Sequence, residues 1–324
     1  MKHTIVQTCL VWVLLCPTLA FAQDIHIEPP AKGERIQLKQ WTLVGESNVD
    51  GSPVTDDLTQ IVRVLSPASG DLRGTAFLLD NCRVMTNLHV LIGIRRPNRR
   101  KPEEEPTLEK GESFVGDTFE FESQPLRWRG GQRAHGRFVV MAHGDGLDTG
   151  TRRSIGPDDW AIGYDADCLS ETQNLGTFRL GSLYDRYRFE NTLAIPLLTA
   201  GFPQITVTGL PDDEYPLYVD SNCRLTGDQS NLSCSIWHGS SGSPLLIGPL
   251  RLGSTLLTSK GRLIFEAVGI MYAGGPKVTS GAVPNFPMLF SIARLFTGSL
   301  EETLKRYLLG PVDVAKLKQR GLAK

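Results

Sequence analysis

The sequence lacks an excess of charge of either sign. Its 324 residues hold 34 Lys and Arg against 35 Asp and Glu, which gives a formal net charge of −1. Recognition of nucleic acid needs a concentrated basic surface, so this composition does not indicate a nucleic-acid partner. No internal repeat is visible. The chain has the composition of an ordinary globular protein, long enough for one large domain or two modest ones.

Long apolar runs are missing after the first 22 residues, so we expect no transmembrane helix there. Ile5 to Leu15 is mostly apolar but too short to span a bilayer, and Lys2 places a positive charge before it. Residues 20–22 are Ala-Phe-Ala, the small-x-small pattern of a signal-peptidase site. We therefore predict a signal peptide over residues 1–22 and a secreted or periplasmic protein without a membrane anchor. An uncleaved anchor is the alternative.

Cysteine is also scarce, with six in the whole chain. Signal cleavage would remove the two at positions 9 and 16 and leave four: Cys82, Cys168, Cys223 and Cys234. An even number in an exported chain predicts two disulfides, and four cysteines allow three pairings. Cys223 and Cys234 flank a polar, hairpin-like segment, so we favour this pair, which leaves Cys82 with Cys168.

Short runs rich in branched and aromatic residues begin at Ile61, with Gly, Pro, Asn or Asp between them, as in IVRVL, GTAFLL, RFVVMA and FEAVGIMY. They predict many short antiparallel strands and an all-β sandwich or barrel fold. Residues 23–49 are polar and weakly patterned, which fits a leader, a propeptide or an ordered extension. Helical spacing occurs only near the end, in NFPMLFSIARLF and SLEETLKRYLL, and predicts a C-terminal helical extension over residues 296–324.

The stretch GSSGSP concentrates small residues around three serines. A serine attacks a carbonyl group only when a base takes its proton and N–H groups stabilise the oxyanion. Ser241 has Gly239 two residues before it and Gly242 directly after it, so a tight turn could direct the N–H groups of Gly239 and Ser241 at one point. Ser240 would point the other way and Ser243 would lie in the following strand. We therefore predict Ser241 as the nucleophile.

His89 is the best candidate for the base, because a predicted strand runs directly into Thr-Asn-Leu-His. Other histidines stand in less defined contexts: His135, His143 and His238. The base needs an acceptor that fixes its tautomer. Asp159 comes directly before the apolar strand WAIGY and can be drawn into the interior, with its neighbour Asp158 as the alternative.

The order His89, Asp159, Ser241 differs from the Asp-His-Ser order of subtilisin, and Ser243 replaces the last glycine of the α/β-hydrolase elbow. The sequence resembles the trypsin-like serine peptidases, in particular the bacterial G-x-S-G-S-P branch related to the glutamyl endopeptidases. The matching motifs are GTAFLLDNCRVMTNLHV, DDWAIGY and GSSGSPLL, with TAGFP and AVGIMYAGG in connecting segments. The resemblance covers roughly residues 61–295.

This resemblance implies a peptidase domain over residues 50–295 with a chymotrypsin-like fold of two six-stranded antiparallel β-barrels. The first barrel would cover about residues 50–170 and the second about 171–290, with the site in the cleft between them. His89 would act as general base and then acid, Asp159 would orient it, and Ser241 would form the acyl-enzyme. The resemblance implies a monomer that hydrolyses a protein or peptide substrate without a metal or cofactor.

Three positions depart from the family. Ser240 stands where trypsin has an aspartate that pairs with a newly cut N-terminus, so that activation mechanism is not supported. The acidic pocket residue of trypsin and the pocket histidine of glutamyl endopeptidases are missing too, which leaves a neutral or apolar substrate side chain as the expectation. The candidate pocket residues are Ser235, Ile236, His238 and Met271.

Two other interpretations remain. The chain could be a non-catalytic secreted binding protein built on a peptidase fold, because one fold hosts many functions. The segment HGDGLDTG places Asp145 and Asp148 among glycines and could hold calcium, but it lacks the spacing and the closing Glu of an EF-hand loop, and a solvated turn is the simpler interpretation.

Overall fold

The computed structural model describes residues 58–67, 69–95, 112–126, 129–144, 158–168, 170–182, 197–203, 217–223, 231–232, 234, 239–248, 251–252, 255–256, 258–259, 262–274 and 291–309. The predicted signal peptide, the 23–49 segment and the Asp145 and Asp148 turn lie outside these ranges. Three of the candidate pocket residues, Ser235, Ile236 and His238, lie outside them as well.

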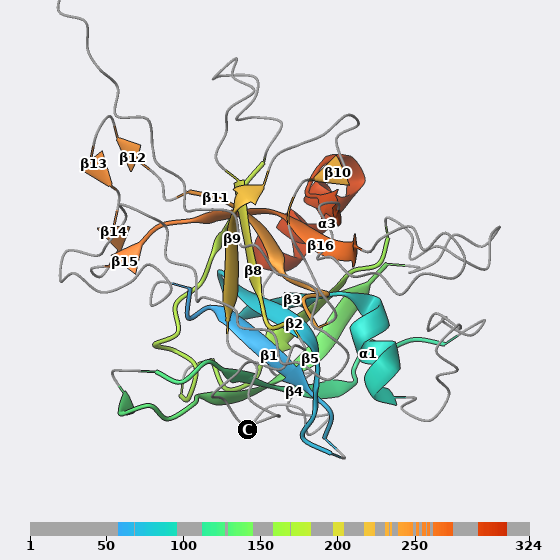
Figure 1. The fold of residues 1–324 in the computed structure, drawn as a ribbon. Coiled ribbons are helices and arrows are strands. Elements are labelled where there is room, and N and C mark those ends of the chain that lie inside the picture. The colour runs from blue at the N-terminus through green and yellow to red at the C-terminus, as the bar shows by residue number, and fades with distance from the viewer. Residues whose placement is uncertain are drawn as a thin grey trace, which may run out of the picture.

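A closed antiparallel barrel forms the first half of the fold (Figure 1). Its six strands follow the order β1-β2-β3-β6-β5-β4 around the barrel. They are β1 (Ile61–Leu65), β2 (Leu72–Leu79), β3 (Arg83–Thr86), β4 (Thr118–Ser123), β5 (His135–His143) and β6 (Ala161–Asp165). The prediction of a β-rich chain with a six-stranded barrel is thus confirmed for this part of the molecule.

A second sheet carries seven strands: β7 (Arg179–Leu180), β8 (Leu197–Gly201), β9 (Tyr218–Cys223), β10 (Asn231–Leu232), β11 (Pro244–Ile247), β16 (Glu266–Gly274) and β17 (Ser291–Leu295). Its order is β10-β17-β16-β11-β8-β9, and β7 pairs in parallel with β16. Two small hairpins join β12 (Arg251–Leu252) to β13 (Thr255–Leu256) and β14 (Thr258–Ser259) to β15 (Arg262–Leu263). Within the described ranges this sheet does not close, so a second six-stranded barrel stays a prediction.

One helix corrects the sequence-based expectation that helices occur only at the end of the chain, and a second helix lies in the SLEETLKRYLL segment, where a C-terminal helix was expected. α1 (Leu88–Arg95) follows β3 directly, and α3 (Gly298–Leu309) follows β17. The helix expected in NFPMLFSIARLF is wrong for Ser291–Leu295, which pairs with β16 as a strand. Ala293 and Leu295 are buried on either side of the half-buried Arg294, and this alternation is that of a strand. No helix in the described part of the chain is long and apolar enough to cross a membrane.

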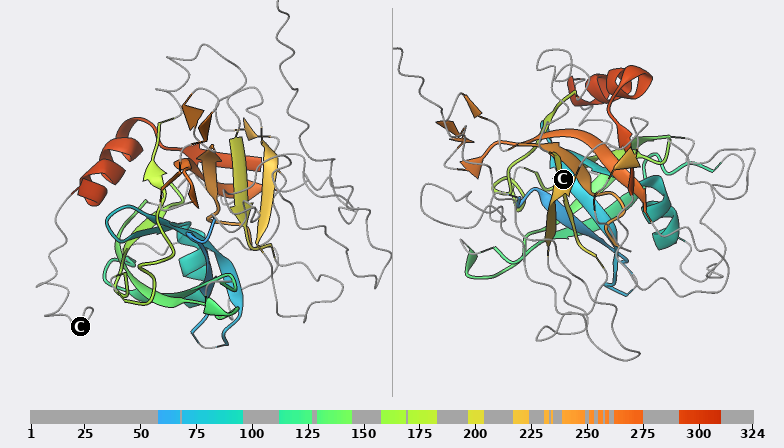
Figure 2. Two further views of the ribbon diagram at one scale, coloured as in Figure 1. Left: turned by 90° about the vertical axis from the view of Figure 1, so that its left-hand side faces the viewer. Right: turned by 45° about the horizontal axis from the view of Figure 1, so that its top comes forward.

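Buried apolar side chains join the barrel, the second sheet and α3 into one body. One cluster lies within the barrel and includes Phe121 and Phe138. A larger cluster joins the three parts and includes Phe77 of β2, Leu198 of β8 and Leu304 of α3. Figure 2 shows the barrel and the sheet packed together with α3 beside them. Because both halves share this core, residues from one half can be held in place against the other.

The β2–β3 hairpin fixes the end of α3 to the barrel. A three-residue loop joins the paired ends of β2 and β3, and two of its residues, Asn81 and Cys82, have positive φ values of 61° and 60°. Asn81 Nδ2 donates to the Leu308 carbonyl at 2.7 Å, and Arg83 Nε donates to the Tyr307 carbonyl at 2.8 Å. These donors satisfy carbonyls of the last helical turn, which have no partner within the helix itself.

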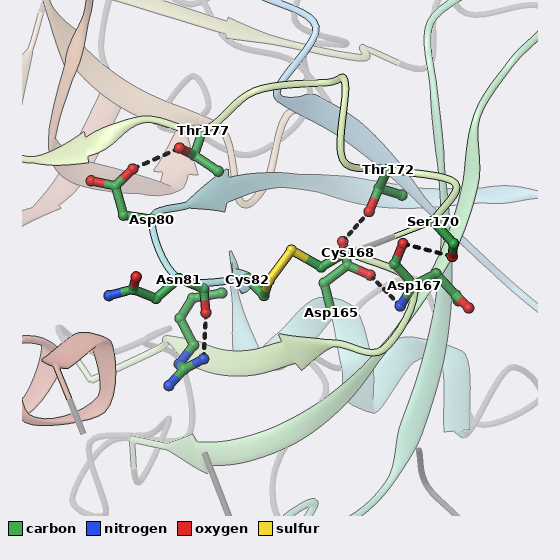
Figure 3. Close-up of a disulfide and its surroundings, with 10 residues drawn as sticks. Asp80, Asn81, Cys82, Asp165, Asp167, Cys168, Ser170, Thr172 and Thr177 are labelled. Carbon is green, nitrogen blue, oxygen red and sulfur yellow. Dashed lines mark hydrogen bonds between the residues drawn. A yellow bond between two sulfur atoms is a disulfide. The ribbon is translucent and has the colours of Figure 1, made fainter. Parts of the chain in front are cut away.

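Disulfides join Cys82 to Cys168 and Cys223 to Cys234, which are the pairings favoured from the sequence. Figure 3 shows the first bridge tying the β2–β3 turn to the segment after β6. Asp165 lies beside this bridge, where its N–H donates to the Cys82 carbonyl at 2.8 Å. Burial raises the pKa of the Asp165 carboxyl to about 6, although the Thr172 hydroxyl and the Asp167 N–H donate to it.

Candidate active site

His89 lies in the first turn of α1, where the chain leaves the barrel. Strand β3 ends at Thr86, and the fully buried Asn87 separates it from Leu88, the first residue of the helix. The sequence predicted a strand end here. A helix forms instead because the apolar residues that follow pack into the barrel core. The His89 side chain is 12 % exposed, so the imidazole lies at the edge of the core and keeps some contact with solvent.

Asp159 binds His89 through both of its carboxylate oxygens. Oδ1 accepts the backbone N–H of His89 at 2.9 Å, and Oδ2 lies 2.5 Å from Nδ1 of the ring. An ionised carboxylate can only accept, so the ring carries its proton on Nδ1. In the neutral imidazole, Nε2 then keeps its lone pair, which is the form that a general base requires.

The Asp159 carboxylate is held in a buried position, where its side chain is 1 % exposed. It accepts two hydrogen bonds, and it lies at the N-terminus of α1, where the helix dipole favours a negative charge. Asn87 Nδ2 also donates to the backbone carbonyl of Asp159 at 2.7 Å and fixes that residue against the strand-helix junction. The neighbouring Asp158 is exposed. Of the two aspartates considered from the sequence, Asp159 is therefore the one that contacts His89.

The GSSGSP segment forms a tight turn in which one serine stands apart from the others. Ser240 and Ser243 are 6 % and 1 % exposed, whereas Ser241 is half-buried. The Ser243 N–H donates to the Ser240 carbonyl at 3.0 Å and closes the turn. Gly239 and Gly242 both have φ of 90°, a conformation that side-chain-bearing residues rarely adopt. Of the three serines, Ser241 has the access to solvent that a nucleophile needs.

The Ser241 turn and α1 meet over Gly74 of β2. The N–H of Thr75 donates to the Ser241 carbonyl at 2.8 Å. A Cβ on Gly74 would lie 2.6 Å from Val90 Cγ2 and 3.1 Å from the Ser241 carbonyl oxygen, so the residue after His89 and the Ser241 turn approach the same point. In the described part of the chain, no hydrogen bond joins His89 to Ser241. Such bonds are often long before substrate binds.

Met271, the described member of the candidate pocket, is fully buried in the core of the second sheet. Its carbonyl accepts the Gly242 N–H at 3.0 Å, and its N–H donates to the Ser243 carbonyl at 2.8 Å. Met271 therefore supports the Ser241 turn through its backbone, and a role for its side chain in substrate selection stays a prediction.

The other histidines that the structure describes bind elsewhere. His135 is 69 % exposed and lies 3.7 Å from a carboxylate oxygen of Glu122. His143 Nδ1 contacts the Gly144 carbonyl at 2.8 Å, which leaves its Nε2 toward the Phe114 N–H. Across the described ranges, no three His, Cys, Asp or Glu side chains gather in a way that could hold a metal ion.

Two residues at the site had no distinguishing signal in the sequence. Asn87 and Thr75 are ordinary members of strand-like runs, and their hydrogen bonds join segments 72 and 164 residues apart. Hydrogen bonds between residues so far apart in the sequence depend on the folded arrangement and cannot be predicted from the local sequence pattern.

No family model matches the chain, and no curated protein matches it by sequence. Among solved structures, the crystal structure of the thermostable serine protease AL20 from an extremophilic microorganism is similar, with a TM-score of 0.42 and 13 % identity. The match covers 78 % of this chain and 97 % of that chain. A TM-score in this range adds nothing to the fold beyond the strand pairing described above.

Proposed function

We propose that the chain is an exported serine endopeptidase that hydrolyses peptide bonds through His89, Asp159 and Ser241. The observation that carries this proposal is the His89–Asp159 pair. A buried carboxylate lies 2.5 Å from Nδ1 and leaves Nε2 as the acceptor, and the nearby turn has one serine, Ser241, that is only half-buried. A histidine with a purely structural role does not need this combination of features. In a peptidase each of them has a chemical role.

In the proposed reaction, His89 Nε2 takes the proton of Ser241 while Oγ attacks the substrate carbonyl carbon. Asp159 stabilises the imidazolium that forms and keeps its own charge. The N–H groups of Gly239 and Ser241 bind the oxyanion of the tetrahedral intermediate. His89 then donates its proton to the leaving amine, and a water activated by the same histidine hydrolyses the acyl-enzyme.

Several features support an exported protein with a peptide substrate. The two disulfides favour an oxidising compartment, in agreement with the signal-like N-terminus. The barrel and the second sheet correspond to the two halves expected of such an enzyme, and we propose that the second sheet closes into a barrel. The substrate side chain before the scissile bond would be neutral or apolar, and the enzyme would act as a monomer.

Labelling with a fluorophosphonate tests the proposal, because this reagent needs an activated serine and not a particular substrate. The native chain starting at Gln23 should gain one adduct by intact mass, mapped to Ser241, and Ser241→Ala should gain none. Ser243→Ala is the matched control. Ser243 Oγ is buried and has no hydrogen-bond partner within the described ranges, so this variant should fold and label like the native protein.

A second preparation that starts at Asp50 separates an inhibitory propeptide from a missing activity. Labelling of the shorter chain alone would assign residues 23–49 an inhibitory role. An absence of labelling in both chains would refute the peptidase proposal and leave a binding protein on the same fold.

A further inference from the structure

Thr75 of β2 connects the barrel to the Ser241 turn through both its side chain and its backbone. The residue is fully buried. Its Oγ1 donates to the Gly239 carbonyl at 2.8 Å, and its N–H donates to the Ser241 carbonyl at 2.8 Å. The same hydroxyl accepts the Phe202 N–H at 3.0 Å, beside the end of β8. A hydroxyl has one proton, and here that proton goes to Gly239.

The hydrogen bonds of the turn show what the Thr75 hydroxyl contributes. The Ser241 carbonyl is bound by the Thr75 backbone, and the Ser240 carbonyl is bound by the Ser243 N–H at 3.0 Å. Substitution of Thr75 leaves both of these backbone bonds in place. The Gly239 carbonyl is the one whose restraint depends on a side chain that can be exchanged.

Gly239 also needs a restraint to keep its conformation. Glycine populates positive and negative φ about equally, and Gly239 is held at a φ of 90°. A hydrogen bond to its carbonyl limits rotation of the backbone at Gly239, and this in turn limits the directions that its N–H can take. Without the bond from Thr75, rotation at Gly239 would move the N–H that the oxyanion needs. The geometry required of such a donor is narrow, about 2.7–3.1 Å from the oxyanion position.

We propose that Thr75 is a positioning residue, whose hydroxyl fixes Gly239 so that its N–H can stabilise the oxyanion. This inference rests on the peptidase function proposed above. It predicts a loss of turnover with little change in substrate affinity, because the Gly239 N–H acts on the transition state and not on the bound substrate.

The decisive comparison is between Thr75→Ser and Thr75→Ala. The two variants lack the same methyl group and differ by one hydroxyl, so any defect in packing is shared. We expect Thr75→Ser to keep kcat near the native value. We expect kcat of Thr75→Ala to be lower by about tenfold or more, with KM changed by less than about threefold, since outright loss of an oxyanion donor costs about 10²–10³ in kcat. Labelling by the fluorophosphonate should slow in parallel.

Thr59→Val is the control for the general cost of a buried threonine hydrogen bond. Thr59 is 3 % exposed, and its Oγ1 donates to the Leu175 carbonyl at 2.6 Å, away from the turn. This variant should lose thermal stability and keep its kcat. Equal kcat for the Ser and Ala variants of Thr75, or an equal loss of kcat in Thr59→Val, would overturn the positioning role. Native protein that neither labels nor hydrolyses peptides would overturn the peptidase function and this inference together.

Discussion

Replacement of Asp159 by asparagine tests the tautomer of His89 with almost no change in shape. The backbone N–H of His89 can only donate, so it will keep the amide oxygen of the new side chain at the Oδ1 position. The amide NH₂ group must then take the Oδ2 position, facing Nδ1. Two donors cannot share a hydrogen bond, so the ring moves its proton to Nε2. Nε2 can then no longer accept the proton of Ser241.

In a serine-peptidase triad this wrong tautomer lowers kcat by about 10⁴, which is about 5.5 kcal/mol at about 1.36 kcal/mol per tenfold. The stability of Asp159→Asn should change little, because the bonds from the His89 N–H and from Asn87 both remain. The assay is kcat on a cleavable peptide, with thermal unfolding measured on the same samples. Asp158→Asn is the matched control, because Asp158 is exposed and should be replaceable without loss of kcat. A kcat for Asp159→Asn within tenfold of the native value would refute the role of the tautomer.

Two further predictions concern the region of the first disulfide. Because burial raises the pKa of Asp165 to about 6, from an ordinary value of about 3.9, the folded state favours the neutral carboxyl. The stabilising contribution of the Asp165 carboxyl is therefore complete below pH 3.9 and is lost as the pH rises through 6. Asp165→Asn, which cannot ionise, should be more stable than the native protein at pH 7.5 by up to about 3 kcal/mol. Thermal unfolding between pH 4 and 8 measures this, and parallel curves for the two proteins would contradict it. Joint replacement of Cys82 and Cys168 by alanine removes a crosslink between residues 86 apart and should cost about 4–5 kcal/mol in urea unfolding, while a cost below about 1 kcal/mol would speak against it.

Local pattern predicted the parts of the fold that depend on neighbouring residues. The runs IVRVL and GTAFLL lie in strands β1 and β2, and their successive apolar side chains point alternately into two different buried clusters. The stretch Ser291–Leu295 was predicted wrongly, because its apolar residues fit a helix and a strand about equally well. Pairing with β16 decided in favour of the strand, and that partner is distant in the sequence. The helix α1 was missed for a similar reason, since eight residues are too short for periodicity to separate a helix from a buried strand.

The contact between His89 and Asp159 was predicted from residue type and order, because few residues of this chain can act as a base and as its acceptor in that order. The supporting residues follow a different rule. The side chains of Thr75 and Asn87 each donate to a backbone carbonyl of a distant segment, and a backbone carbonyl has no counterpart in the pattern of side chains along the sequence. The side chains proposed to take part in catalysis can therefore be predicted from the sequence, whereas those proposed to position them can be found only in the folded chain. Variants of Thr75 test that second group directly, because they leave every chemical group of the site in place.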